Sequence, residues 1–276
     1  MEQMIDHIKS WLEEAGEKIK SFQQTLTISQ KSNRTDLVTN VDRNIQNFLI
    51  EKIHSYDPEA KILAEEEGCN QLADLDGRVF IIDPIDGTLN FVIEGENFCI
   101  MLAVYESGVG KLGFIYDVMR NELFWGGKGI GVYKNDKPMP RPANKSLSEG
   151  LLGVNSYLFG HNKYGIREIA ESSMGTRMYG CAGLELAAIL KGNHIAYISN
   201  LSPWDYAAGN VLLEEFGMVT SGLFGTPLTF DRREYYLAGT PCAYAEIADL
   251  LKKKAKKVEI IHKNDKNGQK INFLEK

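Results

Sequence analysis

The sequence predicts an α+β protein in which helices pack between and outside β-sheets. Three patterns favour this class. Apolar residues recur at helical spacing near the N-terminus, short strand-like runs separated by Gly-, Asn- and Asp-rich turns fill the middle, and helical and strand-like runs alternate in the second half. With 276 residues, of which 43% are hydrophobic and 25% charged, the chain can bury a sizeable core.

Two amphipathic helices are expected first. They cover Met4–Phe22 and Val41–Ile53, because apolar side chains recur every three or four residues in both segments. The segment Tyr56–Pro58 should end the second helix, since a proline disfavours helical geometry in the residue before it. The polar segment Ser29–Thr35, which lies between the two helices, is expected to be a loop.

Short strands are expected next, and their order predicts a largely antiparallel sheet. Their ranges are Ile62–Leu63, Val79–Ile82, Phe98–Tyr105, Leu112–Tyr116, Glu122–Trp125 and Gly131–Tyr133. Gly108–Gly113 matches the spacing of a dinucleotide-binding loop, but it lies between two of these runs and no helix follows it, which favours a hairpin. Pro138–Pro142 is expected to connect two halves, about 1–140 and about 141–276, of a single domain.

The second half is expected to alternate strands and helices. The strands are Leu151–Val154, Arg177–Tyr179, Ile195–Ile198 and Tyr235–Ala238. The helices are Tyr164–Ala170, Leu184–Leu190, Trp204–Phe216 and a last one that runs from about Ala243 into a lysine-rich tail. The five histidines are scattered along the chain, and each is expected at a surface or helix position.

Composition and charge exclude several classes of protein. The longest apolar run, Cys99–Val104, is far shorter than the roughly 20 residues of a membrane span. The N-terminus has no signal-peptide pattern, and the four cysteines form no CxxC pair, so we expect a cytoplasmic protein with reduced thiols. The net charge of −6 argues against a nucleic-acid polymer as partner. Residues 251–276 carry nine lysines and three acids, so the acidic remainder would need metal ions to bind an anion.

The most informative stretch follows the predicted strand Val79–Ile82. It places two acids, Asp83 and Asp86, three residues apart, and Pro84 stiffens the turn between them. Both carboxylates and the carbonyl of Ile85 can therefore point at one metal ion, and hard oxygen ligands of this kind suit Mg²⁺. Taken alone, a surface turn rich in Asp and Gly is the commoner explanation.

Further residues fit the same chemistry. Gly87 lets the chain pass close to a ligand, and a helix that begins at Thr88 would point free N–H groups at an anion. Glu65 follows an apolar pair at the end of a predicted strand, and Asp42 and Asp205 each lie where a helix should begin. A solvated acidic face and simple helix capping are the alternatives for these three acids.

Together these segments resemble the inositol monophosphatase family of Mg²⁺-dependent, lithium-sensitive phosphatases. That superfamily also contains fructose-1,6-bisphosphatases and 3′(2′),5′-bisphosphate nucleotidases. The matching pieces keep the family's order and spacing across nearly the whole chain: Asp36–Asp42, Ala64–Glu66, Asp83–Thr88, Gly180–Ala182 and Trp204–Gly209. The resemblance implies an α/β/α/β/α layered sandwich, a homodimer and a small phosphate ester as substrate.

The resemblance also implies roles for individual residues. The metal ligands would be Glu65, Asp83, the carbonyl of Ile85, Asp86 and Asp205. The catalytic residues would be Glu65 and the pair Asp42 and Thr88, which positions and activates the attacking water. The substrate contacts would be Asp86, Gly87, Thr88, Cys181, Ala182 and Asp205. The implied cofactor is Mg²⁺, as two or three ions, with Mn²⁺ as a substitute and Li⁺ or Ca²⁺ as inhibitors.

The expected function is therefore hydrolysis of small phosphorylated alcohols, of the inositol monophosphate type, by metal-activated water. In animal relatives a Glu seven residues before the aspartate of the Trp-Asp motif contacts inositol, whereas this chain has Ile198 there. Activity on NADP(H), fructose 1,6-bisphosphate or 3′-phosphoadenosine 5′-phosphate is the alternative within the family. A haloacid-dehalogenase-type phosphatase, which forms an aspartyl-phosphate, and a non-catalytic metal-binding regulator are alternatives outside it.

Overall fold

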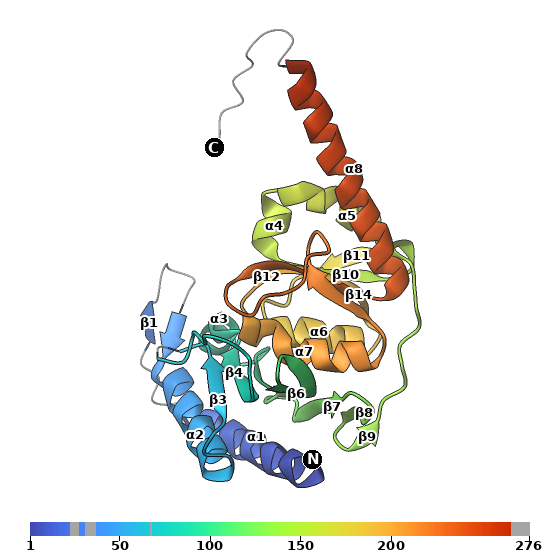
Figure 1. The fold of residues 1–276 in the computed structure, drawn as a ribbon. Helices are drawn as coiled ribbons and strands as arrows, with labels where there is room; N and C mark the ends of the chain where they lie inside the picture. Colours follow the sequence, from blue (N-terminus) through green and yellow to red (C-terminus); the bar gives the residue numbers. More distant parts are fainter. Residues whose placement is uncertain (23–27, 31–36, 67, 266–276) are drawn as a thin grey trace.

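The computed structural model describes residues 1–22, 28–30, 37–66 and 68–265, and it stacks them in five alternating layers of helices and sheets (Figure 1). The described residues form two large sheets, of seven and five strands. One layer of helices lies between these sheets, and another covers the outer face of each. The α+β class and the α/β/α/β/α order are therefore both confirmed.

The first outer layer consists of α1 (Glu2–Phe22) and α2 (Asn40–Tyr56), which match the two predicted helices. Their apolar stripes pack in one cluster against the seven-stranded sheet. Between them, β1 (Ile28–Gln30) pairs antiparallel with β2 (Leu37–Thr39), so the loop prediction is wrong at Ser29 and Gln30. Residues 31–35 of that predicted loop lie outside the described residues. Backbone hydrogen bonds pair the two strands, and strands of three residues are too short to show an alternating pattern.

The seven-stranded sheet has the order β3-β4-β5-β6-β7-β8-β9. Only β3 and β4 are parallel among these neighbours, so the prediction of a largely antiparallel sheet is confirmed. The strands are β3 (Lys61–Ala64), β4 (Arg78–Asp86), β5 (Cys99–Glu106), β6 (Val109–Asp117), β7 (Glu122–Gly127), β8 (Gly131–Lys134) and β9 (Lys137–Pro138). β5 and β6 form the hairpin expected around Gly108. Pro138 itself lies in an edge strand, so the connection between the two halves begins one residue later than predicted.

Both faces of this sheet are buried, which explains the continuous apolar run of β5. Side chains alternate between the faces, so Met101 and Ala103 join the cluster between the two sheets, while Ile100 and Leu102 join the cluster under α1 and α2. β4 alternates in the same way up to its last residues. Asp83 therefore comes at a position of β4 that faces the middle of the molecule.

The five-stranded sheet has the order β11-β10-β12-β14-β13. Its strands are β10 (Leu151–Val154), β11 (Gly175–Arg177), β12 (His194–Leu201), β13 (Val219–Gly222) and β14 (Glu234–Gly239). β10, β12 and β14 match predicted strands, but the strand expected at Arg177–Tyr179 lies two residues earlier. β13 was not predicted, because its residues Val-Thr-Ser-Gly carry only one apolar side chain.

Helices of the second half fill the remaining layers. The central layer holds α6 (Ala182–Leu190) and α7 (Pro203–Glu215), both as predicted. The second outer layer holds α4 (Ser156–Gly160), α5 (Ile166–Glu171) and α8 (Pro241–Asp265), and α8 runs out beyond the body of the molecule (Figure 1). The helix predicted from Tyr164 begins only at Ile166, because Tyr164 has a φ of 56°. α4 was not predicted, although Asn155 caps it by accepting hydrogen bonds from two of its backbone N–H groups.

Candidate active site

The end of β4 places Asp83 and Asp86 at the inner face of the seven-stranded sheet. Both are buried, with 2% and 7% of their surfaces exposed. The pairing of β4 with β5 is irregular between the two, as a proline in the turn requires. The backbone N–H of Ile85 donates to Oδ1 of Asp83 over 3.1 Å, which fixes that carboxylate inside the turn.

Helix starts surround this turn. α3 (Thr88–Ile93) begins directly after Gly87, whose φ of 89° favours glycine. A Cβ on Gly87 would lie 3.0 Å from Cβ of Cys181, so the chain passes close to the start of α6. At that start, the N–H of Ala182 donates to Oδ1 of Asp86 over 3.1 Å. The helix expected at Thr88 is thus confirmed, and it abuts a second helix N-terminus.

α7 contributes Asp205 from its first turn. Ser202 is the N-cap residue and precedes Pro203, the first helical residue. Oδ2 of Asp205 accepts a hydrogen bond from the Ser202 N–H over 2.8 Å, which completes a capping box. Capping and a site role are compatible here, because Asp205 also lines the cleft that contains Asp83 and Asp86.

Asp42 and Thr88 meet although 46 residues separate them. Asp42 lies in the first turn of α2 and is fully buried. The Thr88 hydroxyl lies 3.1 Å from Oδ1 of Asp42 and 3.0 Å from the carbonyl oxygen of Ile85. A hydroxyl that donates to Asp42 keeps lone pairs with which it can accept a hydrogen bond from water.

The predicted site residues converge on one open cleft of about 660 Å³. Those that line it are Glu65, Asp83, Ile85, Asp86, Gly87, Thr88, Cys181, Ala182 and Asp205. Asp42 lies behind Thr88, to which it is hydrogen-bonded. Every residue that the sequence placed in the site is therefore part of the cleft or in direct contact with it.

The carboxylates of the cleft repel one another. Burial raises the pKa of Asp83 well above its usual value, and the negative charges of Glu65, Asp86, Asp205 and Asp42 raise it further. Burial raises the pKa of Asp205 to about 7, although the positive charge of Arg233 opposes the rise. Such a cluster of hard oxygen ligands fits divalent cations, which would remove this repulsion.

Comparison with known proteins agrees with this chemistry. The sequence profile of the inositol monophosphatase family matches residues 1–259. The chain belongs to this family. An inositol-1-monophosphatase of Bacillus subtilis is 41% identical over 250 residues, which cover 88% of this chain and 94% of the relative. A fructose-1,6-bisphosphatase/inositol-1-monophosphatase of Thermotoga maritima is 34% identical over 195 residues, 70% of this chain and 74% of that one.

Solved structures of inositol monophosphatases have the same fold. A staphylococcal inositol monophosphatase I in complex with products superposes with a TM-score of 0.83 at 28% identity, over 91% of this chain and 95% of that one. A 2′-AMP complex of an inositol monophosphatase II gives a TM-score of 0.84 at 32% identity, over 95% and 99%. The present chain is accordingly a phosphoric monoester hydrolase that uses divalent metal ions. Its described part contains no helix long and apolar enough to cross a membrane.

Sequence reasoning missed two charged residues of this cleft, Arg233 and Glu185, and the buried partner of one of them. Arg233 extends from β14's start, and its Nη2 lies 3.6 Å from Oδ2 of Asp205. Glu185 of α6 lines the cleft, and its Oε2 lies 3.0 Å from Nδ1 of His194. The expectation of a surface or helix position is wrong for His194, which is buried in β12 because Glu185 gives it a polar partner. An acid in the otherwise apolar helix Leu184–Leu190 was the signal that could have found this pair.

The part of the cleft away from the carboxylates also differs from the expectation. Ile198 is fully buried in the outer cluster beneath α4, α5 and α8, so its side chain faces away from the cleft. The neighbouring positions Ser199 and Asn200 line the cleft instead, together with Asn155. Polar groups that can bind an alcohol are therefore present, although they do not include a residue at position 198.

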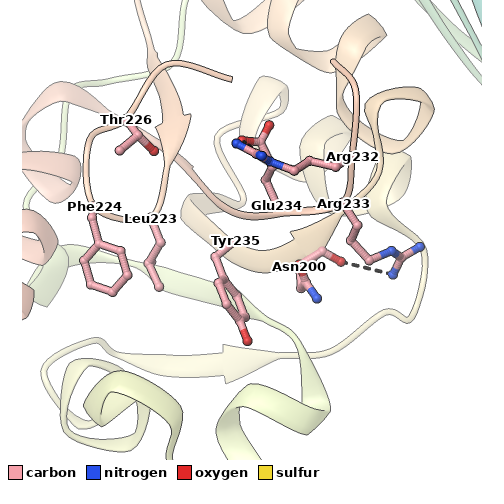
Figure 2. Close-up of a pocket in the computed structure, with 8 residues that line it drawn as sticks. All are labelled: Asn200, Leu223, Phe224, Thr226, Arg232, Arg233, Glu234 and Tyr235. Carbon is pink, nitrogen blue, oxygen red and sulfur yellow. Dashed lines mark hydrogen bonds and ion pairs between the residues drawn. The ribbon is translucent and has the colours of Figure 1, made fainter. Parts of the chain in front are cut away.

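A second pocket of about 370 Å³ adjoins this end of the cleft and shares Asn200 and Arg233 with it. Figure 2 shows the apolar residues Phe224 and Leu223 on one side of this pocket and Arg233 on the other, with Tyr235 between them and the guanidinium of Arg232 beside Glu234. Nη1 of Arg233 donates to the carbonyl oxygen of Asn200 over 3.3 Å. The pocket combines two guanidinium groups with aromatic rings.

Proposed function

We propose that this inositol monophosphatase hydrolyses small phosphorylated alcohols of the inositol monophosphate type, with Mg²⁺ as cofactor. One observation carries the proposal: four acids from distant parts of the chain, Glu65, Asp83, Asp86 and Asp205, share a cleft with the Asp42–Thr88 pair. Names of similar proteins, including inositol-1-monophosphatase from Bacillus subtilis and an inositol monophosphatase/NADP phosphatase in complex with Mg²⁺ and phosphate, support the substrate and the ion.

In this proposal the metal ligands are Glu65, Asp83, the Ile85 carbonyl, Asp86 and Asp205. We propose two or three Mg²⁺ ions, with Mn²⁺ as a substitute and Li⁺ or Ca²⁺ as inhibitors. Bound Mg²⁺ would neutralise the ester's charge and lower the pKa of the attacking water. The backbone N–H groups of Gly87 and Thr88 would hold the phosphate oxygens, and Cys181 and Ala182 would contact the substrate from the start of α6.

The chain's own residues position the reaction. The Thr88 hydroxyl donates to Asp42, so it can accept a hydrogen bond from the attacking water and hold one of its lone pairs toward phosphorus. As that water loses its proton to the Thr88 oxygen, the Thr88 hydroxyl passes its own proton to the carboxylate of Asp42. Asp205 and Arg233 lie where the alcohol would leave, and Ser199 and Asn200 would bind its hydroxyls.

The test uses protein freed of metal with EDTA and then assayed for phosphate release from inositol 1-phosphate. Added Mg²⁺ should restore activity, and Asp83→Asn should stay inactive at the same Mg²⁺ concentration. A single turnover in ¹⁸O-labelled water should put the label in phosphate. Label in the protein, or activity that persists with EDTA, would contradict direct attack by metal-activated water.

A second candidate is a phosphatase for substrates with a second anionic group, such as NADP(H), fructose 1,6-bisphosphate or 3′-phosphoadenosine 5′-phosphate. The arginine-containing pocket beside the cleft favours it, since guanidinium groups bind phosphates bidentately. Arg232→Ala should then lower kcat/KM for these substrates by about tenfold, the loss of about one charged hydrogen bond. Inositol 1-phosphate should be unaffected. An equal effect on all substrates would contradict use of the pocket.

We further propose that the chain is a single domain, forms a homodimer and works in the cytoplasm. The shared layer α6–α7 between the sheets supports one domain, and family resemblance supports the dimer. All four cysteines are free thiols in the structure, which suits a reducing compartment. Light scattering should give twice the chain mass of 30.9 kDa. A monomeric mass at micromolar concentration would contradict the dimer.

A further inference from the structure

Two thiols lie directly behind the carboxylate of Asp86. Cys181, at the start of α6, has its Sγ 3.1 Å from Oδ2 of Asp86. Cys99, at the start of β5, has its Sγ 3.5 Å from the same oxygen, and the two sulfur atoms are 3.6 Å apart. All three side chains are buried, and the proposed mechanism gives Cys99 no role.

The triangle formed by these three atoms has nearly the size of a tetrahedral zinc site. Zinc bonds of about 2.3 Å to sulfur and about 2.0–2.2 Å to oxygen imply edges of about 3.8 Å between two sulfurs and about 3.6 Å between sulfur and oxygen. Two of the three observed edges, 3.6 and 3.5 Å, are within about 0.2 Å of these values. Only the edge from Cys181 to Asp86 must lengthen, by roughly 0.5 Å.

The surroundings hold this triangle in place. The N–H groups of Ala182 and Gly183 donate to the two oxygens of Asp86, which orients the carboxylate from behind. A Cβ on Gly183 would lie 2.4 Å from Sγ of Cys99 and 3.2 Å from Oδ2 of Asp86. Only a glycine therefore fits at position 183, and its backbone packs directly against the thiol and the carboxylate. Cys181 also lines the cleft, through which an ion could enter.

We propose that Cys99, Cys181 and Asp86 form an inhibitory site for a thiophilic divalent cation such as Zn²⁺. Mg²⁺ would not use the site, because it prefers oxygen ligands and avoids thiolates. An ion bound there displaces both thiol protons to solvent and takes Asp86 away from the proposed magnesium cluster. Inhibition should therefore weaken as Mg²⁺ rises. This consequence rests on the proposed function, whereas binding at the thiols does not.

The test begins with binding alone, in a Cys69→Ser/Cys242→Ser background that retains only the two buried thiols. Co²⁺ is the probe, because its bonds to thiolates give an intense near-ultraviolet absorption that carboxylate ligands do not. The background protein, reduced and free of other metals, should show this band with one Co²⁺ bound. Addition of Cys99→Ser should abolish or at least halve it. A background protein without the band overturns the proposal.

The second measurement is Zn²⁺ inhibition of phosphate release at saturating Mg²⁺. Cys99→Ser should keep its basal activity, since a hydroxyl at this position can still donate to Asp86. Its inhibition constant for Zn²⁺ should rise by about 10- to 100-fold, while the exposed-cysteine control Cys242→Ser should behave as the unmodified chain. Equal inhibition of all variants would mean that Zn²⁺ binds only the carboxylates, which overturns the proposal. A protein without phosphatase activity would contradict the proposed function but leave the Co²⁺ result decisive for the thiol site.

Discussion

In the proposed mechanism, Thr88 connects the attacking water to Asp42, to which its hydroxyl is hydrogen-bonded. Thr88→Ala should lower kcat by about a hundredfold or more while KM changes little, because positioning and proton transfer act in the transition state. Thr88→Ser keeps the hydroxyl and should retain most of the activity. Steady-state kinetics on the three proteins checks this. A change confined to KM would assign Thr88 to substrate binding instead.

Asp83 is a residue whose removal should have opposite effects on activity and on stability. Asp83→Asn removes a proposed metal ligand, so kcat should fall by about a hundredfold or more. It also removes a buried charge that four neighbouring carboxylates repel. In EDTA the variant should therefore melt higher than the unmodified chain, by about 2–4 °C for each kcal/mol of relief. A lower melting temperature in EDTA would contradict the repulsion.

Individual site residues differed in how far the sequence could predict them. The sequence predicted that the carboxylates of Asp83 and Asp86 lie close together, because the two residues are three apart and Pro84 stiffens the turn between them. Arg233 and Cys99 were not predicted, because their place beside Asp205 and Asp86 depends on how β14 and β5 pack against α7 and α6. No local pattern encodes such contacts. The position of Ile198, seven residues before Asp205, predicted that it would face the alcohol. The alternation of side chains along β12 instead directs Ile198 into the outer core cluster.

The turn between β4 and α3 is the element on which the proposed phosphate binding depends. Gly87→Ala would strain a residue at φ 89° and push its Cβ to 3.0 Å from Cys181, which would displace the first turn of α3. Unfolding free energy should drop by about 1–3 kcal/mol, and kcat/KM should fall as well. Gly108→Ala is the matched control: its φ is +77°, but a Cβ there meets no atom of the described residues within 4 Å. It should lose comparable stability and keep full activity. Equal activity of the two variants would contradict a role for the Gly87 turn.

Long or strongly patterned elements followed from the sequence, and short polar ones did not. The apolar stripe of α1 can be buried only if the segment is a helix, so α1 was predicted. The unbroken apolar run of β5 likewise predicted a strand, and this strand is buried on both faces. The strand β1 has three residues, and β13 has four with one apolar side chain, so backbone pairing outweighs side-chain pattern in them. Element boundaries moved where one residue adopts unusual geometry, as Tyr164 does before α5.

At the scale of the whole molecule, the proposed active site lies where the two sheets and the central helical layer meet. β4 supplies Asp83 and Asp86 from one sheet, while α6 and α7 bring Cys181 and Asp205 from the half that contains the other. Neither half holds a complete set of carboxylates. Packing of the central layer therefore holds the acids together against their mutual repulsion. This repulsion lowers the free energy of unfolding of the whole chain when no cation is bound.

This repulsion makes stability depend on pH in a definite direction. The pKa of Asp205 is raised from 3.8 to about 7, so between these values the folded state binds more protons than the unfolded state. The contribution of Asp205 to stability is therefore most favourable below pH 3.8 and is lost as pH rises toward and through 7. Surface acids paired with lysines, such as Glu14 and Glu168, have lowered pKa values and titrate below this window, so they do not mask the effect.

Thermal melting between pH 5 and 8 tests the whole argument. In EDTA the melting temperature should fall across this range, and with saturating Mg²⁺ the fall should largely disappear, because the cation replaces the protons that the carboxyls lose. The stabilisation by Mg²⁺ should therefore grow with pH. Asp205→Asn removes the group with the raised pKa and should flatten the curve in EDTA. A melting temperature in EDTA that rises from pH 5 to 8 would mean that the carboxylates do not oppose folding, and the proposed cation cluster would lose its electrostatic basis.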